Sequence, residues 1–243
     1  MKVMQINVVY KGGSTGSLVY DIHKGLLERG IESIVCYGRG ENVREGKVYK
    51  TASETLSKFN VLKSRITGLQ YNGSYFGTNN LLDKIINEKP DIVHLQCING
   101  HFVNIYKLLE FLSENKIRTV VTLHAEFLFT GSCGHSLSCD KWKNTPGCGN
   151  CPQLWEATNS YFFDRTQTAW KKMRDAFEDF DKNLVVTSVS QWLMERARQS
   201  VILANKEHRT IINGIDTNET FRYSDHKWIK EKYNLKNEKI ILH

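Results

Sequence analysis

The stretch that decides the fold is KVMQINVVYKGGSTGS, residues 2–17. A β-branched apolar run over 2–10 leads into a glycine-rich turn, and apolar residues then recur at helical spacing from Leu18 and Ile22 onward. A strand, a tight turn and a helix in this order form the opening unit of a parallel sheet. The same alternation returns along the chain, and it predicts strands at 2–10, 32–38, 91–98, 118–124, 183–189 and 209–215.

The alternation of strands and helices indicates an α/β protein. Strands such as TVV (119–121) and LVV (184–186) are apolar on both faces, which indicates that helices cover both sides of the sheet. The helical stretch 78–88 ends before Pro90, where the next strand begins. We therefore expect a Rossmann-like parallel sheet with helices on both faces.

Composition and the N-terminus bear on the cell compartment. The 243 residues carry 33 Lys and Arg against 26 Asp and Glu, and the formal charge of +7 fits either an anionic partner or a merely soluble surface. Gln5 and Asn7 interrupt the first apolar stretch, which indicates a strand and not a signal peptide. We therefore expect a cytoplasmic protein whose six cysteines stay reduced.

The first turn contains Gly12, Gly13 and Gly16. Ligands of open parallel sheets bind beyond the carboxyl ends of the strands, and glycines at a helix start let a phosphate approach the free backbone N–H groups. The spacing is neither G-x-G-x-x-G nor that of a P-loop. A phosphate-binding turn and a purely steric turn therefore both remain open.

Three histidines, His94, His101 and His124, fall at or just after predicted strand ends. A single histidine in such a place is more often a hydrogen-bonded structural residue than a reactive one. Three on one edge of a sheet favour a role in ligand binding. His124, at the very end of its strand, is the residue that we expect to contact a ligand.

The long segment 125–160 carries Cys133, Cys139, Cys148 and Cys151, spaced C-x5-C-x8-C-x2-C. The last two resemble half of a zinc knuckle, whereas the first two depart from that pattern. A structural zinc, unligated thiols and a disulfide all remain open. A closed four-thiolate site would brace the loop without taking part in a reaction, and a zinc-knuckle nucleic-acid binder is disfavoured because the basic residues are scattered.

Segment 55–70 places apolar residues along one side of a predicted helix, with Lys58, Lys63 and Arg65 interleaved. It could rest on an anionic membrane. The pattern favours an ordinary domain helix that buries its apolar side and exposes its basic side.

Five stretches together resemble the N-terminal half of family 4 glycosyltransferases with the GT-B fold. In chain order they are GGSTGSLVYDI (12–22), KPDIVHLQCINGHF (89–102), RTVVTLHAEFLFTG (118–131), SVSQWLMERARQS (188–200) and IINGIDTNETF (211–221). The cysteine loop is similar to that of a subgroup found in capsule and exopolysaccharide gene clusters. The similarity extends over nearly the whole chain.

The resemblance implies a retaining glycosyltransferase that moves a sugar from a nucleotide-sugar donor to a glycan or lipid-linked acceptor in cell-surface polysaccharide biosynthesis. It implies that Gly12, Gly13 and Gly16 approach the donor diphosphate and that His124 is the catalytic residue contacting the donor sugar. We also expect His94, His101 and Asn213 at the acceptor or in the cleft. The resemblance also implies that catalysis needs no metal. We expect no nucleic-acid partner, and a protein that can sit peripherally on the inner face of the cell membrane.

The resemblance also divides the chain. Residues 1–223 are expected to form the acceptor-side domain, and 224–243 a linker helix and the first strand of a donor domain, with Ile240, Ile241 and Leu242 in that strand. On this reading the 243 residues alone lack the donor wall and are expected to be inactive. The alternative is a non-catalytic acceptor-binding half that partners a separate donor-binding subunit.

Overall fold

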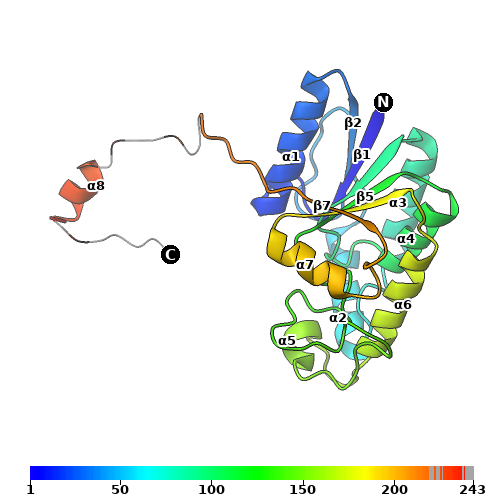
Figure 1. The fold of residues 1–243 in the computed structure, drawn as a ribbon. Helices are drawn as coiled ribbons and strands as arrows, with labels where there is room; N and C mark the ends of the chain where they lie inside the picture. Colours follow the sequence, from blue (N-terminus) through cyan, green and yellow to red (C-terminus); the bar gives the residue numbers. More distant parts are fainter. Residues whose placement is uncertain (219–221, 223–224, 226, 237, 239–243) are drawn as a thin grey trace. The chain divides into compact units, whose positions relative to one another are not determined.

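The fold is described from a computed structural model, which covers residues 1–218, 222, 225, 227–236 and 238 (Figure 1). Strands and helices alternate as the sequence predicts. In chain order the elements are β1 (Lys2–Asn7), α1 (Gly13–Glu28), β2 (Glu32–Tyr37), β3 (Val48–Lys50), α2 (Glu54–Thr67), α3 (Tyr75–Glu88), β4 (Ile92–Leu95), α4 (Ile105–Glu114), β5 (Thr119–Leu123), α5 (Leu154–Thr158), α6 (Thr166–Glu178), β6 (Leu184–Ser188), α7 (Gln191–Gln199), β7 (Glu207–Thr210) and α8 (Lys227–Lys232).

The seven strands form one parallel sheet in the order β3-β2-β1-β4-β5-β6-β7. β1 is the strand from which the chain extends the sheet in both directions, because β2 and β3 add on one side and β4 to β7 on the other. Met4 of β1 is in register with Ile34 of β2 and with Val93 of β4. The predicted Rossmann-like sheet is confirmed.

Both faces of the sheet are covered, as expected. In β2 the side chains alternate, so that Ile34 and Cys36 join the main core cluster while Val35 and Tyr37 join a smaller cluster with Val19 of α1. The main cluster also contains buried residues of α3, α4 and α6. Figure 1 shows α1 on one side of the sheet and α3, α4 and α6 on the other.

The sequence prediction missed one strand and gave the wrong bounds for another. The three-residue β3 was not foreseen, because one buried residue, Val48, leaves no periodic pattern. The last predicted strand, 209–215, is β7 at Glu207–Thr210, and Ile211, Ile212 and Ile215 lie exposed beyond it. β7 is the edge of the sheet, where charged residues such as Glu207 and Arg209 protect the open side of the strand from further pairing.

The expectation for segment 55–70 is confirmed for the helix and wrong for the side that the helix buries. A helix is present as α2, begun by the Ser53 side chain, which accepts a hydrogen bond from the Leu56 N–H, and ended by Gly68 with φ 73°. Its apolar side, however, is exposed, and its buried residues are Ser57, Asn60 and Ser64. The helix packs with the opposite orientation to that of an ordinary domain helix.

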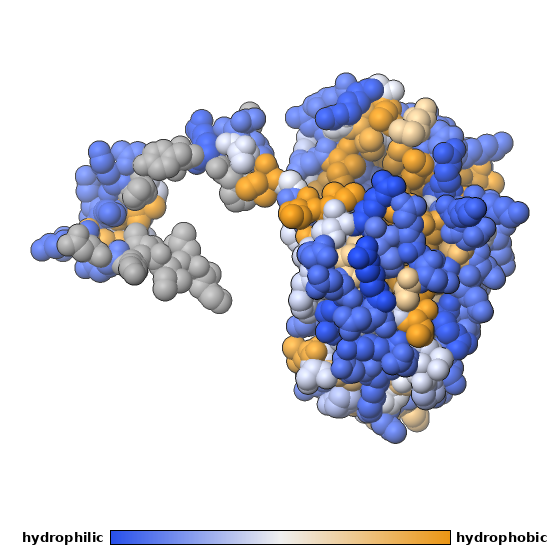
Figure 2. Space-filling view, in the orientation of Figure 1, coloured by the Kyte–Doolittle hydropathy of each residue, from blue (hydrophilic) through white to orange (hydrophobic). Residues whose placement is uncertain are grey.

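The chain divides into two compact units, Met1–Ile212 and Asn213–His243. The second unit contains α8, and the predicted strand at 240–242 lies outside the described residues. The predicted boundary between 223 and 224 stays a prediction. No helix in the part of the chain that the structure covers is long and apolar enough to cross a bilayer. On the side of the first unit seen in Figure 2, hydrophilic side chains dominate and hydrophobic ones form separate patches.

Candidate functional site

The candidate site lies where the turns after β1 and β4 meet. Because the chain extends the sheet in both directions from β1, the connections that follow β1 and β4 continue toward opposite sides of the sheet, and open α/β sheets bind ligands at the carboxyl ends of such strands. The Val8 N–H donates to the Cys97 carbonyl at 2.7 Å. A side chain at Gly100 would meet the Val8 Cγ2 atom at 2.1 Å, so glycine is needed for the two turns to touch.

Asn7 connects these two turns through its side-chain hydrogen bonds. Its Oδ1 atom accepts a hydrogen bond from the Cys97 N–H at 2.9 Å, and its Nδ2 donates to the Val9 carbonyl at 2.7 Å. The residue is fully buried at the end of β1. Sequence reasoning missed Asn7 as a site-forming residue, although a buried amide at a strand end is a signal that a turn needs its hydrogen bonds.

The three glycines of the first turn have different roles. A Cβ atom at Gly16 would lie 3.1 Å from Val9 Cγ2 and 3.3 Å from the Lys11 nitrogen, so Gly16 permits close packing of the turn. Gly12 and Gly13 face open space, and Gly13 has φ 65°. No side chain caps the start of α1. The N–H groups at this helix start are therefore accessible to an anion.

His94 lies within β4, in register with Val120 of the adjacent strand β5, and His124 follows the end of β5. His94 Nε2 is 2.7 Å from the Thr122 hydroxyl, which is 2.7 Å from that of Thr187. Burial, with a smaller contribution from His124, lowers the pKa of His94 to about 4. Both imidazoles are therefore neutral at pH 7, since burial also lowers the pKa of His124.

The Nε2 atom of His124 is buried and has no hydrogen-bond partner within the described residues. Buried polar side-chain atoms are nearly always paired, so an unpaired one at the carboxyl edge of a sheet indicates a missing partner. A neutral imidazole nitrogen can donate to or accept from a sugar hydroxyl. Of the three predicted histidines, His124 is the one with this free capacity.

His101 is held by the inner side of α2. Its Nδ1 atom lies 3.2 Å from the Ser64 hydroxyl, and its carbonyl accepts from Asn60 Nδ2 at 3.3 Å. Its ring lies 5.5 Å from that of Tyr71. Burial, followed by the charges of Arg39 and Arg65, lowers the pKa of His101 to about 4. These contacts give His101 a structural setting that His124 lacks.

Glu126 and Arg196 form a buried ion pair that sequence reasoning missed. Glu126 is 1% exposed, and its carboxylate contacts the Arg196 Nε atom and accepts the Ser136 N–H. The Arg196 Nη2 atom donates to the Ser136 hydroxyl at 2.6 Å. The pair fastens the long loop to α7, and the signal for it was a carboxylate within the apolar run AEFLFTG.

The four loop cysteines are free thiols that lie near one another. The hydrogen bond between the Cys133 and Cys151 thiols raises the pKa of Cys133 and lowers that of Cys151 to about 7. Burial raises the pKa of Cys148, whose sulfur accepts the Gly131 N–H at 3.2 Å. No three His, Cys, Asp or Glu side chains in the described part of the chain are arranged to hold a metal ion. The structural zinc stays a prediction.

Asn213 is exposed and opens the second compact unit. The site described above belongs to the first unit, and it brings together the open start of α1, His94 and His124. β1 and β5 are separated by one strand, so their ends lie roughly 10 Å apart. A sugar joined to a diphosphate can bridge such a separation.

Comparison with known proteins finds a matching family and solved structures of similar fold. The family model described as Glycosyltransferase Family 4 matches residues 15–219. The solved structure of sucrose-phosphate synthase from Thermosynechococcus elongatus is similar, with a TM-score of 0.53 at 11% identity, over 97% of this chain and 53% of that one. A structure of UGT2 from Phytolacca americana, complexed with UDP-2fluoro-glucose and pterostilbene, gives a TM-score of 0.43 at 10% identity, over 95% and 57% of the two chains, which is too low to support an argument. The chain spans about half the length of these proteins. A search of curated proteins finds no match.

Proposed function

The chain belongs to glycosyltransferase family 4, and from that premise we propose that it provides the acceptor-side wall of a sugar-transfer site. The donor is a nucleotide sugar, and the acceptor is a glycan or lipid-linked glycan in cell-surface polysaccharide biosynthesis. The observation that carries the proposal is the unpaired, buried Nε2 atom of His124, at the edge of the sheet where the connections after β1 and β4 continue in opposite directions.

The chemistry of the reaction accounts for this arrangement. Transfer from a nucleotide sugar builds negative charge on the departing diphosphate, and preorganised hydrogen-bond donors stabilise such charge. Gly12 and Gly13 leave the backbone N–H groups of α1 open to a diphosphate. His124 then holds a hydroxyl of the donor sugar as a neutral hydrogen-bonding partner, since burial lowers its pKa. His94, on the neighbouring strand, is paired with the Thr122 hydroxyl.

A substitution at His124 tests the proposal in the organism that encodes the protein. With His124→Ala in the chromosome, we expect transfer from labelled nucleotide sugars in cell extracts to fall about a hundredfold, the usual effect of losing one such contact. Surface polysaccharide should be lost in parallel. The matched control is His208→Asn, because His208 lies on β7 and its Nε2 atom is paired with the Leu203 carbonyl at 2.7 Å. Unchanged transfer in the His124→Ala strain would contradict the proposal.

We further propose that transfer retains the anomeric configuration of the donor sugar and needs no metal for the reaction step. The family resemblance supports both statements. The anomeric proton coupling of the first product formed, measured by NMR in the extract assay, separates retention from inversion before mutarotation occurs. Transfer that persists in excess chelator supports the second statement, and transfer abolished by chelator and restored by a divalent ion contradicts it.

A further inference from the structure

Helix α2 is packed with its polar side inward. Ser57, Asn60 and Ser64 are buried, and two of them hold His101 as described above. The outward row consists of large apolar side chains between 42% and 63% exposed, namely Leu56, Phe59, Leu62 and Ile66. Helices of soluble domains normally bury the apolar side, so this row indicates an apolar environment outside the fold.

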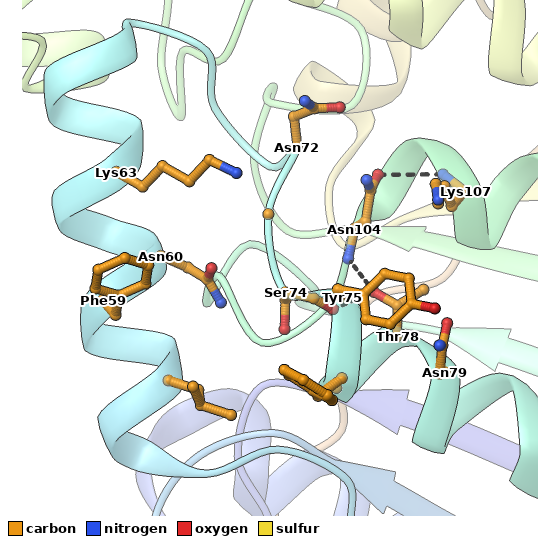
Figure 3. A pocket seen from close by; sticks show the side chains of 14 residues that line it. Phe59, Asn60, Lys63, Asn72, Ser74, Tyr75, Thr78, Asn79, Asn104 and Lys107 are labelled. Atoms are coloured by element: carbon orange, nitrogen blue, oxygen red, sulfur yellow. Dashed lines mark hydrogen bonds between the residues drawn. The ribbon is translucent and has the colours of Figure 1, made fainter.

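The start of α3 extends the row. Tyr75 and Phe76 are 65% and 64% exposed, and with Leu56 and Phe59 they line a pocket of about 460 Å³ between α2 and α3. Figure 3 shows the Lys63 side chain reaching from α2 toward this pocket, on the side facing Tyr75. The pocket is open, lined by aromatic rings, and has two lysines in its wall, Lys63 and Lys107.

An aromatic turn extends the row past the other end of α2. The Tyr161 N–H donates to the Arg65 carbonyl at 2.7 Å, and a Cβ atom on Gly68 would lie 2.1 Å from the Phe163 carbonyl oxygen. The turn therefore packs directly on the end of the helix, and Gly68 permits this contact. Its rings stay outside, with Phe162 70% exposed, and successive rings from Tyr161 to Phe163 lie about 6 Å apart.

We name the exposed apolar side chains of α2, of the start of α3 and of the turn packed on the end of α2 the α2 face. Its members are Leu56, Phe59, Leu62, Ile66, Tyr75, Phe76, Tyr161, Phe162 and Phe163. Every exposed phenylalanine in the described part of the chain belongs to it. Scattered apolar residues need no explanation, but an aromatic surface spanning two helices and a turn does.

The charges around the α2 face are mainly positive. Lys58, Lys63 and Arg65 project from α2 and form no ion pair with any residue that the structure describes, and the same holds for Lys107 and Arg165. The nearby acid Glu54 is paired with Arg39 and Lys50. Glu156, on α5, and Asp164, directly after Phe163, are exposed acids on the turn side, and the Asp164 carboxylate accepts hydrogen bonds from the N–H groups of Cys151 and Thr166.

We infer that the α2 face binds an anionic membrane surface, with its rings in the headgroup region and its lysines on lipid phosphates. Unpaired Lys beside exposed Phe and Tyr is the composition of membrane-surface helices, whereas protein–protein interfaces are depleted in Lys. The inner side of α2 holds His101 on the turn after β4, so a membrane bound to the outer side would lie one helix away from the proposed transfer site. A lipid-linked acceptor could reach the site from that membrane.

Vesicle sedimentation of the 243-residue chain tests this inference. We expect the chain to sediment with phosphatidylcholine vesicles that contain phosphatidylglycerol, and far less with phosphatidylcholine alone. Leu62→Ser and Phe162→Ser should each lower the partition coefficient about tenfold, because each removes one apolar side chain that would insert into the lipid. Lys58→Gln and Lys63→Gln should each lower it about fivefold, and added salt should have the same effect.

Matched controls separate membrane binding through the α2 face from nonspecific adsorption to vesicles. Leu27 on α1 is 50% exposed and Leu62 is 47% exposed, so Leu27→Ser makes the same change away from the α2 face and should leave sedimentation unchanged. Lys182→Gln, before β6, is the control for charge. Two results would overturn the inference: no sedimentation with phosphatidylglycerol vesicles at low salt, or light scattering that shows a dimer which Leu62→Ser dissociates, since a second copy would then occupy the face.

Discussion

His94 lies within β4 and His124 follows the neighbouring strand β5, and burial keeps both imidazoles neutral at pH 7. A neutral histidine recognises hydroxyl groups, whereas a cationic one would compete for the diphosphate. His94 is paired with Thr122, and His124 keeps its Nε2 atom free. His94 therefore already has a hydrogen-bond partner, and His124 is the residue that we propose to contact the ligand.

The pH dependence of stability tests the neutral state of His94. Its folded pKa of about 4 lies below the unfolded value of 6.5, so the unfolded state takes up the proton first. Stability from this group is complete above pH 6.5 and is lost as the pH falls toward 4. We expect the step from about pH 7.5 to about pH 5 to cost about 2 kcal/mol through His94 alone.

Urea unfolding of the wild type and His94→Asn at both pH values measures this contribution. The variant loses the Thr122 contact at every pH, so the readout is the difference between the two pH values and not the absolute stability. A His94→Asn protein with the same loss of stability between these pH values as the wild type would show that His94 is not buried in its neutral form.

Among the elements, the long loop after β5 departs most from regular structure. The buried pair of Glu126 and Arg196 fastens it to α7, and Trp142, which is fully buried, donates from its Nε1 atom to the Cys139 carbonyl at 2.7 Å. Trp170 of α6 donates in turn to the Trp142 carbonyl at 2.9 Å. The loop is therefore a packed part of the domain, and its start at Ala125 follows His124 directly.

Removing one partner of the buried pair should destabilise the domain strongly. We expect Glu126→Ala to lower the free energy of unfolding by about 3–5 kcal/mol, because Arg196 would be left charged and largely buried. Asp175→Ala, which breaks the exposed pair with Arg174, should change it by less than about 1 kcal/mol. Denaturant unfolding of both variants measures the two changes in the free energy of unfolding. Equal changes would mean that the pair of Glu126 and Arg196 does not hold the loop in place.

The cysteines of the same loop give a second prediction for this element. If Cys133, Cys139, Cys148 and Cys151 form a four-thiolate site, the reduced protein should contain one zinc per chain, and cobalt should replace it with the strong absorption of thiolate coordination. Cys148→Ser should abolish that absorption, whereas Cys36→Ser, in β2, should leave it intact. Protein that contains no zinc and gives no cobalt spectrum would leave the thiols unligated.

How far the sequence predicts each element depends on what surrounds it. β1, β2, β5 and β6 were predicted within three residues because β-branched runs buried on both faces leave a clear pattern. The packing of α2 was not predicted, because periodicity shows that a helix has an apolar side but not which side faces the core. At the site, glycines and histidines were found by type and position, whereas Asn7, Glu126 and Arg196 depend on contacts between distant segments.

At the scale of the whole molecule, one parallel sheet carries two surfaces with different tasks. Its carboxyl edge presents the open start of α1 and the free nitrogen of His124, and α2 joins this edge, through His101, to the outward aromatic surface. The proposed donor, acceptor and membrane therefore meet around the turns that follow β1 and β4. This placement follows from the strand order, because ligands of open α/β sheets bind where the connections of neighbouring strands continue in opposite directions.

The most direct test is an NMR titration of the isotope-labelled chain with a nucleotide sugar, because chemical shifts report weak binding residue by residue. We predict that the amide signals of Gly13 and Ser14 and the ring signals of His124 move together and saturate. Gly12→Val should suppress these shifts by filling the open space above α1, while Gly25→Val, later in the same helix, should not. Shifts that cluster elsewhere, or none at any concentration, would contradict a donor site at this edge of the sheet.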